Sequence, residues 1–402
     1  MRRRPDNTPV RVLAVDHTAG LAGGEVALAR LLEEIDRDEY DLRVLVLADG
    51  PLVERLGAAS IPTAVLPASR ALTEAGRDKA ASSLLQLAGN AGRTMLLVPR
   101  VARAIRGSGA DLVVANTLKA AVITAFAAPL AGRRWVWHLH DRIAADYLPA
   151  PLVSALRILA RMGPRVVVAN SVATRRTLPA LPDDRVVVAY PAAPASTPLP
   201  PRPPKTPTFG LLGRIAPTKG QREFIQAAAV MTENAPEARF IVLGDAMFND
   251  HAFAEEVRAL PAVLGVADAV TFAGWVDDPA ETLQTLTALV HASPVPEPFG
   301  QVVVEGMLAG IPVIATAAGG VPEIVDPDGV AAPVADGVTQ TPFGLLVRPG
   351  DAAALALAMR YIADHPGEAG DTATRAQAMA RERFDIAGTA RTVQDAWGRA
   401  LR

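Results

Sequence analysis

The stretch Pro296-Glu-Pro-Phe-Gly-Gln-Val-Val-Val-Glu-Gly-Met-Leu-Ala-Gly-Ile-Pro-Val-Ile-Ala315 contains a loop, a helical pattern and an apolar run in immediate succession. The apolar run Leu289–Ala292 before it is typical of a buried strand. After the Pro-rich loop, we expect a helix to begin near Phe299 and to end at Gly310. The run Pro312–Ala315 then indicates another buried strand. A strand, a helix and a strand in this order predict a parallel sheet of the α/β class.

The same alternation extends in both directions along the chain. Short apolar runs, most of them without polar alternation, are separated by helical patterns, which is typical of parallel strands covered on both faces. The runs are Val10–Val15, Leu42–Leu47, Asp111–Ala115, Trp135–His138, Arg165–Ala169 and Arg185–Val188 in the first half, and Thr208–Leu212, Arg239–Leu243, Ala269–Phe272, Leu289–Ala292, Pro312–Ala315 and Phe343–Val347 in the second. We therefore expect two Rossmann-like domains with doubly wound parallel sheets.

A proline-rich segment marks the boundary between the two halves. Residues 191–207 contain eight prolines in seventeen positions, which favours an extended connector. We predict an N-terminal domain over 1–190, this linker, a C-terminal domain over 208–384, and a C-terminal helix over 385–402 that can pack back on the N-terminal domain. Two such domains are expected to face a central cleft at the carboxyl ends of their strands, where open α/β sheets bind ligands.

The composition excludes several function classes. The 402 residues include 40 Lys and Arg against 42 Asp and Glu, a net charge of −2, so no global charge favours nucleic acid as a partner. The absence of cysteine excludes disulfides, thiolate metal sites and a cysteine nucleophile. The longest uncharged stretch, Gly306–Pro322, is broken by glycine and proline and is shorter than the roughly 20 residues that span a bilayer.

We expect a soluble cytoplasmic protein, and the oligomeric state stays open. Peripheral contact with the inner face of a membrane is also left open. Residues 93–106 place four arginines among apolar residues in a helical pattern that we expect Pro99 to interrupt. A solvated helix face explains the same pattern.

Two glutamates flank the start of the helix in the opening stretch. A helix start presents unpaired N–H groups, here at Gly300, Gln301 and Val302, which can hold a phosphate. Glu305, about one and a half turns into the helix, can accept hydrogen bonds from vicinal hydroxyls beyond the phosphate. Glu297 can hold hydroxyls on the other side. This layout suits a nucleotide-sugar, and an ordinary helix cap with a solvated glutamate explains it equally well.

Other strand ends of the second half carry cations and glycines. Arg214 and Lys219, five residues apart, are placed to neutralise a diphosphate and its growing charge on departure, although surface solubility also explains them. Gly244 ends a strand and allows close backbone approach. Trp275 is placed to border a nucleobase, and half-buried core packing is an equally good explanation.

Taken together, these motifs resemble the retaining family 4 glycosyltransferases of the GT-B fold. The resemblance covers about residues 209–324 and rests, in order and spacing, on Gly213-Arg214 with Lys219-Gly220, Pro296-Glu-Pro-Phe-Gly300 with Glu305, Ala309-Gly-Ile-Pro-Val313, and Gly319-Gly-Val-Pro-Glu-Ile-Val325. It implies a nucleotide-sugar donor, such as a UDP- or GDP-sugar, which is a co-substrate bound without metal or other cofactor. It also implies that Arg214 and Lys219 contact the diphosphate, Glu297 the sugar and Glu305 the ribose.

The first domain is expected to hold the acceptor. The glycines after the first strand do not form the Gly-x-Gly-x-x-Gly dinucleotide motif, which disfavours a dehydrogenase. Gly23 and Gly24 instead resemble the glycine loop of the family, which faces the donor phosphate, and a tight turn is the alternative. His138 and His140 share a face of one strand, with His140 nearer its carboxyl end. The family places a histidine there, which implies that His140 contacts the donor sugar and orients the reacting centre.

The predicted site therefore has three parts. Catalytic roles are assigned to His140, Glu297, Arg214 and Lys219. Donor contacts are predicted for Gly23, Gly24, Gly213, Arg214, Lys219, Gly244, Trp275, Glu297, Phe299, Gly300, Gln301 and Glu305. Weaker acceptor candidates are His17, Asp141, Asn116, Asn170 and Ser171. Helix capping is the alternative explanation for the polar residues at 116–117 and 170–171.

One segment departs from the family pattern. Residues 326–342 are an apparent insertion, which we interpret as either a flap near the donor or a decorated sheet edge. Asp326-Pro-Asp328 imitates a metal-binding aspartate pair, but the flanking Pro and Gly favour turn chemistry, and no metal site is predicted.

We predict a retaining glycosyltransferase that uses a glycan, a lipid-linked sugar or a small molecule as acceptor. The alternatives are a non-hydrolysing sugar-nucleotide epimerase of the same fold and a non-catalytic paralogue that only binds a partner. We expect Arg214 and Lys219 to lie in the open cleft.

Overall fold

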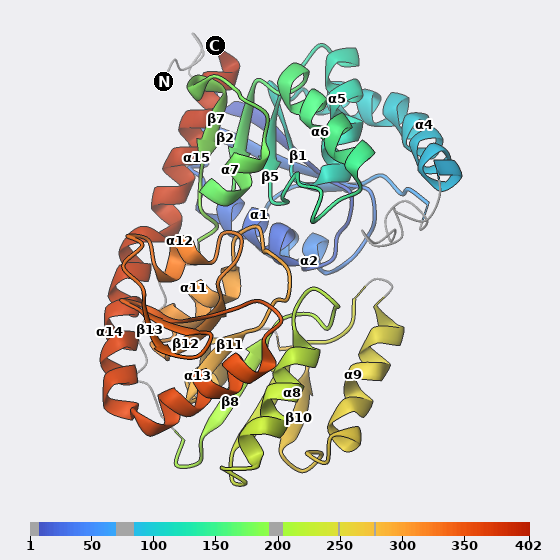
Figure 1. Ribbon diagram of the computed structural model, residues 1–402. Helices are drawn as coiled ribbons and strands as arrows, with labels where there is room; N and C mark the ends of the chain where they lie inside the picture. The colour runs from blue at the N-terminus through green and yellow to red at the C-terminus, as the bar shows by residue number, and fades with distance from the viewer. Residues whose placement is uncertain (1–7, 70–83, 193–203, 248–249, 277–278) are drawn as a thin grey trace. The chain divides into compact units, whose positions relative to one another are not determined.

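The computed structural model describes residues 8–69, 84–192, 204–247, 250–276 and 279–402. The chain divides into two compact units, which are considered separately below (Figure 1). Unit 1 comprises Met1–Pro194 together with Ile386–Arg402, and unit 2 comprises Ala195–Asp385. Residues 193–203 of the predicted linker lie outside the described residues.

Unit 1 is built on a parallel sheet that has seven strands among the described residues, in the order β3-β2-β1-β4-β5-β6-β7. The strands are β1 (Val10–Asp16), β2 (Tyr40–Val46), β3 (Thr63–Val65), β4 (Leu112–Ala115), β5 (Arg134–Leu139), β6 (Val166–Ala169) and β7 (Val186–Val188). The helices are α1 (Gly23–Glu34), α2 (Pro51–Ala58), α4 (Leu84–Ser108), α5 (Leu118–Leu130), α6 (Ala150–Met162), α7 (Val172–Thr177), the 3₁₀ turn η2 (Asp183–Arg185) and α15 (Ile386–Leu401). The short edge strand β3, which is mostly exposed, was not predicted.

Alternate strand residues point to opposite faces of this sheet, and each face has its own hydrophobic core. Val15, Trp135 and Trp137 pack with the buried residues of α4, α5 and α6. Val12 and Val136 pack with those of α1, α2 and α15. The apolar runs of the sequence are therefore strands buried on both faces, as the absence of polar alternation predicts.

The terminal helix α15, drawn in red in Figure 1, belongs to unit 1 and lies against α1, β5 and β6. Trp397 is its fully buried anchor. The indole Nε1 of Trp397 donates to Nε2 of His138 at 3.2 Å, and the two rings stack with their centroids 6.0 Å apart. Tyr40 meets the same indole edge-on at 5.5 Å.

The helix α4 contains Pro99, which was expected to interrupt it, and that expectation was wrong. Pro99 itself is exposed, whereas Val98, Val101 and Ile105 are buried in the core shared with α5. This packing offsets the cost of about 3 kcal/mol that a proline imposes on a helix interior. No helix among the described residues combines the length and the apolar character that crossing a membrane requires.

Unit 2 contains a second mainly parallel sheet, in the order β10-β9-β8-β11-β12-β15-β14-β13. The strands are β8 (Thr208–Leu212), β9 (Arg239–Leu243), β10 (Val270–Gly274), β11 (Ala288–His291), β12 (Val313–Thr316), β13 (Ala332–Ala335), β14 (Val338–Thr341) and β15 (Gly344–Val347). The helices are α8 (Gln221–Thr232), α9 (His251–Val263), α10 (Ala280–Leu283), α11 (Gln301–Leu308), α12 (Pro322–Val325), α13 (Ala352–Asp364) and α14 (Pro366–Arg383).

Buried residues of α8, α9 and α13 pack on one face of this sheet, while Leu289 of β11 points to the other face, against Gly306 of α11. The predicted α/β class with two parallel-dominated sheets is confirmed.

The apparent insertion at residues 326–342 forms a hairpin on the sheet. Strands β13 and β14 pair antiparallel, and β14 pairs antiparallel with β15, so the segment extends the edge of the sheet. The decorated-edge interpretation is therefore correct. Asp326 accepts from the backbone N–H groups of Val330 at 2.9 Å and Ala331 at 3.3 Å, which is the turn chemistry expected of it.

The burial of His138 makes the stability of unit 1 depend on pH. Burial, with a smaller effect of His140, lowers the pKa of His138 from 6.5 to about 3. Between these two values the unfolded chain binds a proton that the folded chain does not, so stability is present above pH 6.5 and is lost as the pH falls. The free energy of unfolding should fall by about 1.4 kcal/mol per pH unit from His138 alone.

Chemical denaturation of the wild type and of His138→Gln between pH 7 and pH 4.5 measures this effect. The glutamine can still accept from Trp397 but does not titrate, so its stability should depend less on pH. Parallel curves for the two proteins would contradict the assignment.

Candidate active site

The loop between β8 and α8 carries the two predicted cations of unit 2. Gln221 Nε2 donates to the carbonyl of Arg214 at 2.9 Å and fixes the start of the loop. Gly220 ends the loop with a φ of 80°, and a Cβ there would lie 2.0 Å from the carbonyl oxygen of Ala292. Only glycine can therefore occupy this position, where the loop passes the end of β11.

Glu297 is the centre of the arrangement in unit 2. Nζ of Lys219 lies 2.5 Å from Oε1 of Glu297, and Nε2 of His291 lies 3.5 Å from Oε2. The Glu297 side chain is only 10% exposed. Burial alone would raise the pKa of Glu297, but Lys219 and His291 hold it well below its usual range. The carboxyl group is therefore ionised at neutral pH and has a cation on one side and an imidazole on the other.

The backbone of Glu297 is fixed by the glycine turn after β12. The N–H of Gly320 donates to the carbonyl of Glu297 at 2.9 Å, and Gly319 pairs with Glu297 as a parallel bridge. Gly319 has a φ of 66°, and a Cβ there would lie 1.9 Å from the Glu297 carbonyl oxygen. The Gly319-Gly320 motif thus allows the turn to approach the Glu297 loop closely.

His291 is a site residue that the sequence reasoning missed. It ends β11 and is buried, and its Nδ1 lies 3.1 Å from Oγ1 of Thr316 at the end of β12. His291 follows the same pattern as His140, a histidine at the carboxyl end of a central strand, but only His140 was predicted as a site residue.

Arg214 and Lys219 are both paired with carboxylates in unit 2. Nη1 of Arg214 lies 2.5 Å from Oδ2 of Asp250, and the two side chains are each 21% exposed. Lys219 is 30% exposed and contacts Glu297. Each cation is therefore partly exposed and paired with a nearby carboxylate.

The helix α11 begins at Gln301, after Gly300, whose φ is 109°. Its N-terminus has no side-chain cap, so a capped helix does not explain this motif. Glu305 is partly buried, and its Oε1 lies 3.4 Å from Nε2 of Gln301, one turn earlier. The ring of Phe299, a predicted donor contact, is buried and meets Phe384 edge-on at 5.7 Å.

The remaining donor candidates of unit 2 lie at strand ends. Gly213 donates from its N–H to Leu243 at 2.9 Å, and a Cβ on Gly244 would lie 2.2 Å from the carbonyl oxygen of Gly213. The two loops therefore approach each other as closely as the glycines predict. Trp275 is 47% exposed, so about half of it is buried.

In unit 1, the predicted residues gather around the ring of His140, just beyond the end of β5. Nε2 of His140 lies 3.0 Å from Oδ1 of Asn116, and Nδ2 of Asn116 donates to Oδ2 of Asp16 at 2.8 Å. Gly23 and Gly24 are the first residues of α1, and a Cβ on Gly24 would lie 3.6 Å from the His140 ring. His138 is instead a core residue bonded to Trp397, so only His140 belongs to this cluster.

The other acceptor candidates of unit 1 differ in whether they contact the His140 cluster. His17 Nδ1 lies 2.8 Å from Oγ1 of Thr117 and belongs to the same cluster. Asp141 accepts from the hydroxyl of Tyr147 at 2.9 Å. Ser171 and Thr117 cap α7 and α5, as the alternative explanation held.

The two asparagines are not caps, so the alternative was wrong for Asn116 and Asn170. Nδ2 of Asn170 donates to the backbone carbonyl of His140 at 3.2 Å. Both asparagines therefore act on the His140 segment, one at its ring and one at its backbone.

Among the described residues, Asp16, His17 and Glu25 form a group whose possible metal-ligand atoms lie within 4.8 Å of one another. Oδ1 of Asp16 accepts from the N–H of Thr18 at 3.3 Å, and His17 is bonded to Thr117. Because these ligand atoms already have protein partners, the group does not by itself indicate a metal site.

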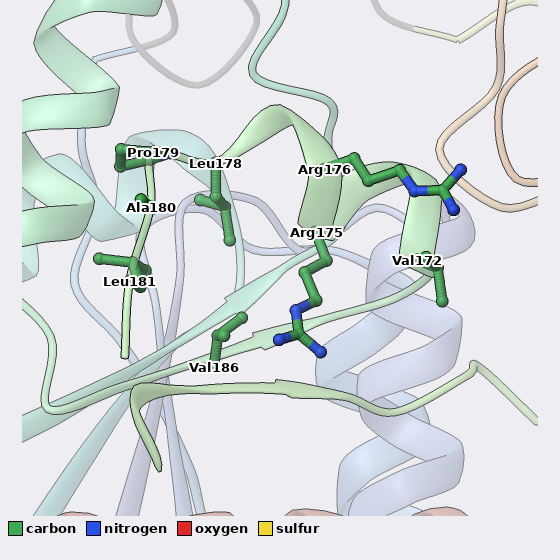
Figure 2. Close-up of a pocket in the computed structure, with 8 residues that line it drawn as sticks. All are labelled: Val172, Arg175, Arg176, Leu178, Pro179, Ala180, Leu181 and Val186. Carbon is green, nitrogen blue, oxygen red and sulfur yellow. The ribbon is translucent and has the colours of Figure 1, made fainter. Parts of the chain in front are cut away.

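Figure 2 shows an open cavity of about 390 Å³ in unit 1. Its lining is mainly apolar, and the residues are Val172, Arg175, Arg176, Leu178, Pro179, Ala180, Leu181 and Val186. The Arg175 side chain extends toward Val186, and its guanidinium is paired with Asp183 at 2.7 Å. None of the predicted site residues lines this cavity, so it is separate from the candidate active site.

Comparison with known proteins gives one family match for each half of the chain. A sequence profile described as Glycosyltransferase Family 4 matches residues 21–196, and one described as Glycosyl transferases group 1 matches residues 206–365. D-inositol 3-phosphate glycosyltransferase of Streptomyces avermitilis is 36% identical over 160 residues, which are 38% of this chain and 32% of that protein. 2-Deoxystreptamine glucosyltransferase of Streptomyces kanamyceticus is 30% identical over 158 residues, which are 39% of this chain and 36% of that protein. The matched segments thus span about a third of the length of these relatives.

Solved structures resemble nearly the whole chain. HepE of Anabaena in complex with UDP and glucose has a TM-score of 0.78 and 27% identity, covering 97% of this chain and 99% of that one. Sucrose-phosphate synthase of Thermosynechococcus elongatus has a TM-score of 0.75 and 18% identity, covering 97% and 98%, which shows a shared fold. With one profile matching in each unit and these structures covering both units, the chain belongs to the group 1, family 4 glycosyltransferases of the GT-B fold.

Proposed function

We propose that this protein is a retaining glycosyltransferase that transfers a sugar from a nucleoside diphosphate to a hydroxyl group of an acceptor. The donor is assigned to unit 2, and the acceptor and His140 to unit 1. UDP is the favoured nucleotide, because HepE was crystallised with UDP, UDP-glucose, and UDP with glucose, and resembles this chain at 26–27% identity over nearly its full length.

The observation that carries the proposal is the buried Glu297 carboxylate between Lys219 and His291. A carboxylate that is kept ionised accepts hydrogen bonds from sugar hydroxyls, and the neighbouring ammonium can neutralise a phosphate oxygen. Glu305, partly buried on α11, is assigned to the ribose, and the uncapped helix start to the diphosphate. Arg214 adds a second cation from the same loop as Lys219.

The acceptor is proposed only as a hydroxyl-bearing molecule. The curated relatives carry the names of different acceptors, D-inositol 3-phosphate and 2-deoxystreptamine, and match only part of this chain. The epimerase alternative needs no acceptor, and the non-catalytic alternative needs neither transfer nor a donor. The measurements below separate the three.

The stereochemical course tests the proposal. In retention, the bond from the anomeric carbon to the phosphate oxygen breaks, and the bond to the acceptor oxygen forms on the same face. The departing diphosphate takes the acceptor proton, so no separate base is required. A gluco-configured α-linked UDP-sugar should therefore give an α-linked product.

Proton NMR coupling at the new anomeric centre, recorded early in the reaction, measures this outcome. EDTA should leave the rate unchanged, and His140→Ala should be much slower but give the same anomer. A reaction without acceptor serves as the control for hydrolysis. A β-linked product would contradict retention, and conversion of the donor to another nucleotide-sugar would favour the epimerase.

The Lys219–Glu297 pair has a second, structural consequence. Replacing Lys219 by Met leaves a buried carboxylate without its cation, and loss of one partner of such a pair costs about 3–5 kcal/mol when burial is complete. Because Lys219 is 30% exposed, we expect a loss of about 2–3 kcal/mol in unfolding free energy. Adding Glu297→Gln should recover most of that loss. Either single change should lower turnover by about 10²–10³.

Denaturant unfolding of the four proteins of this double-mutant cycle measures the coupling. Arg222→Met is the matched control, because Arg222 pairs at 2.6 Å with the exposed Glu256 and should cost at most about 1 kcal/mol. A Lys219→Met variant as stable as this control would show that Glu297 does not depend on Lys219.

A further inference from the structure

We infer that Asp16 and Asn116 are positioning residues that hold the ring of His140 in its Nε2–H form, so that Nδ1 accepts a hydrogen bond from a sugar hydroxyl. The identity of the ligand rests on the proposed function. The form of the ring rests only on contacts within unit 1.

The orientation of the Asn116 amide is determined by two acceptors. Nδ2 of Asn116 lies 2.8 Å from Oδ2 of Asp16 and 3.2 Å from the carbonyl oxygen of Gly24. A carboxylate and a backbone carbonyl can only accept, so the amide nitrogen must face them. The amide oxygen is thereby directed at Nε2 of His140, 3.0 Å away. Because this oxygen also only accepts, Nε2 must carry the hydrogen.

The chain of hydrogen bonds is anchored at both ends. Asp16 is fully buried at the end of β1, and its Oδ1 accepts from the N–H of Thr18 at 3.3 Å. At the other end, Nδ2 of Asn170 donates to the carbonyl of His140 at 3.2 Å and fixes the backbone that carries the ring. The ring orientation is therefore set from β1 and β6 as well as from β5.

The neutral ring of His140 carries a hydrogen on only one of its two nitrogens. Burial lowers the pKa of His140, although the charges of Asp141 and Asp16 oppose this effect, so the ring is neutral at neutral pH. With the hydrogen on Nε2, Nδ1 has a free lone pair, and in the described part of the chain no hydrogen bond to Nδ1 is formed. A neutral acceptor pairs with a hydroxyl and not with a phosphate oxygen, which selects the sugar over the diphosphate as its partner.

His138 provides an internal comparison two residues earlier on the same strand. The indole of Trp397 can only donate, and it donates to Nε2 of His138 at 3.2 Å. The hydrogen of His138 must therefore lie on Nδ1. Two neutral histidines of β5 and its end are thus expected to have opposite tautomers.

Long-range ¹H–¹⁵N correlation spectra of the [¹⁵N]histidine-labelled full chain, without substrate at neutral pH, measure both tautomers. Signals are assigned with His140→Gln and His138→Gln. We expect an unprotonated Nδ1 for His140 and an unprotonated Nε2 for His138. In Asn116→Ala, the His140 signals should move toward a mixture of tautomers while those of His138 stay in place. Asn170→Ala, which touches only the backbone of His140, is the matched control and should leave the tautomer unchanged.

The double variant Asp16→Asn/Asn116→Asp exchanges the polarity of the pair and again offers an acceptor to Nε2, so it should restore the wild-type tautomer. An Nδ1–H form of His140 in the wild type, or an unaltered tautomer in Asn116→Ala, would overturn the inference. If Asn116→Ala does not fold, the wild-type spectrum alone decides.

Activity gives a separate readout. Asn116→Ala should lower kcat by about 10²-fold through misplacement of the ring, with the Kd for UDP unchanged. The double variant should recover part of the lost kcat. Wild-type kcat in Asn116→Ala with a mixed tautomer would overturn the positioning role. The expected tautomer in a wild type that transfers no sugar would contradict the proposed function alone.

Discussion

Glu297 joins three segments of unit 2 that are far apart in sequence. Its carboxylate contacts Lys219 in the loop after β8 and His291 at the end of β11, and its backbone pairs with Gly319 in the turn after β12. A buried charge costs several kcal/mol unless it is paired, so the position of Lys219 is tied to that of Glu297. The same constraint explains the glycines. Gly220 and Gly319 lie where any Cβ would collide with backbone atoms, at Ala292 and at Glu297 itself. The same motifs therefore supply the charged side chains, Lys219 and Glu297, and the glycines that let their loops pack closely.

In unit 1, the alternation of side chains along β5 determines where His140 lies. Residues 136, 138 and 140 point to the same face of the sheet, because side chains alternate along a strand. His138 is buried against Trp397 on that face, so His140 lies on the same side, just beyond the end of β5. The ring of His140 then meets Asn116 from the end of β4 and Gly24 from the start of α1. The C-terminal helix, which contributes Trp397, is thus linked to the site through the core and has no part in its polar contacts.

The α/β class and the two mainly parallel sheets were predictable from the sequence, because continuous apolar runs mark buried parallel strands. The grouping of polar motifs was also predictable within each sheet, because motifs at the ends of parallel strands share one edge. The sequence also predicted which histidine lies at the end of its strand. It did not reveal that Lys219 and Glu297 contact each other, because 78 residues separate them and only the strand order β8–β11 brings them together. For the same reason His291 was missed, since its role depends on Glu297. Pro99 was misjudged because local helix propensity takes no account of tertiary packing.

The assignment of Glu297 to the sugar and Glu305 to the ribose is the central claim, and calorimetric titration of UDP tests it most directly. Glu305→Ala should bind UDP more weakly, because a ribose contact is lost. Glu297→Gln should bind UDP as tightly as the wild type or more tightly, because the charge of Lys219 is no longer neutralised by the carboxylate, although sugar transfer is lost. Equal losses of UDP affinity in the two variants would contradict the account.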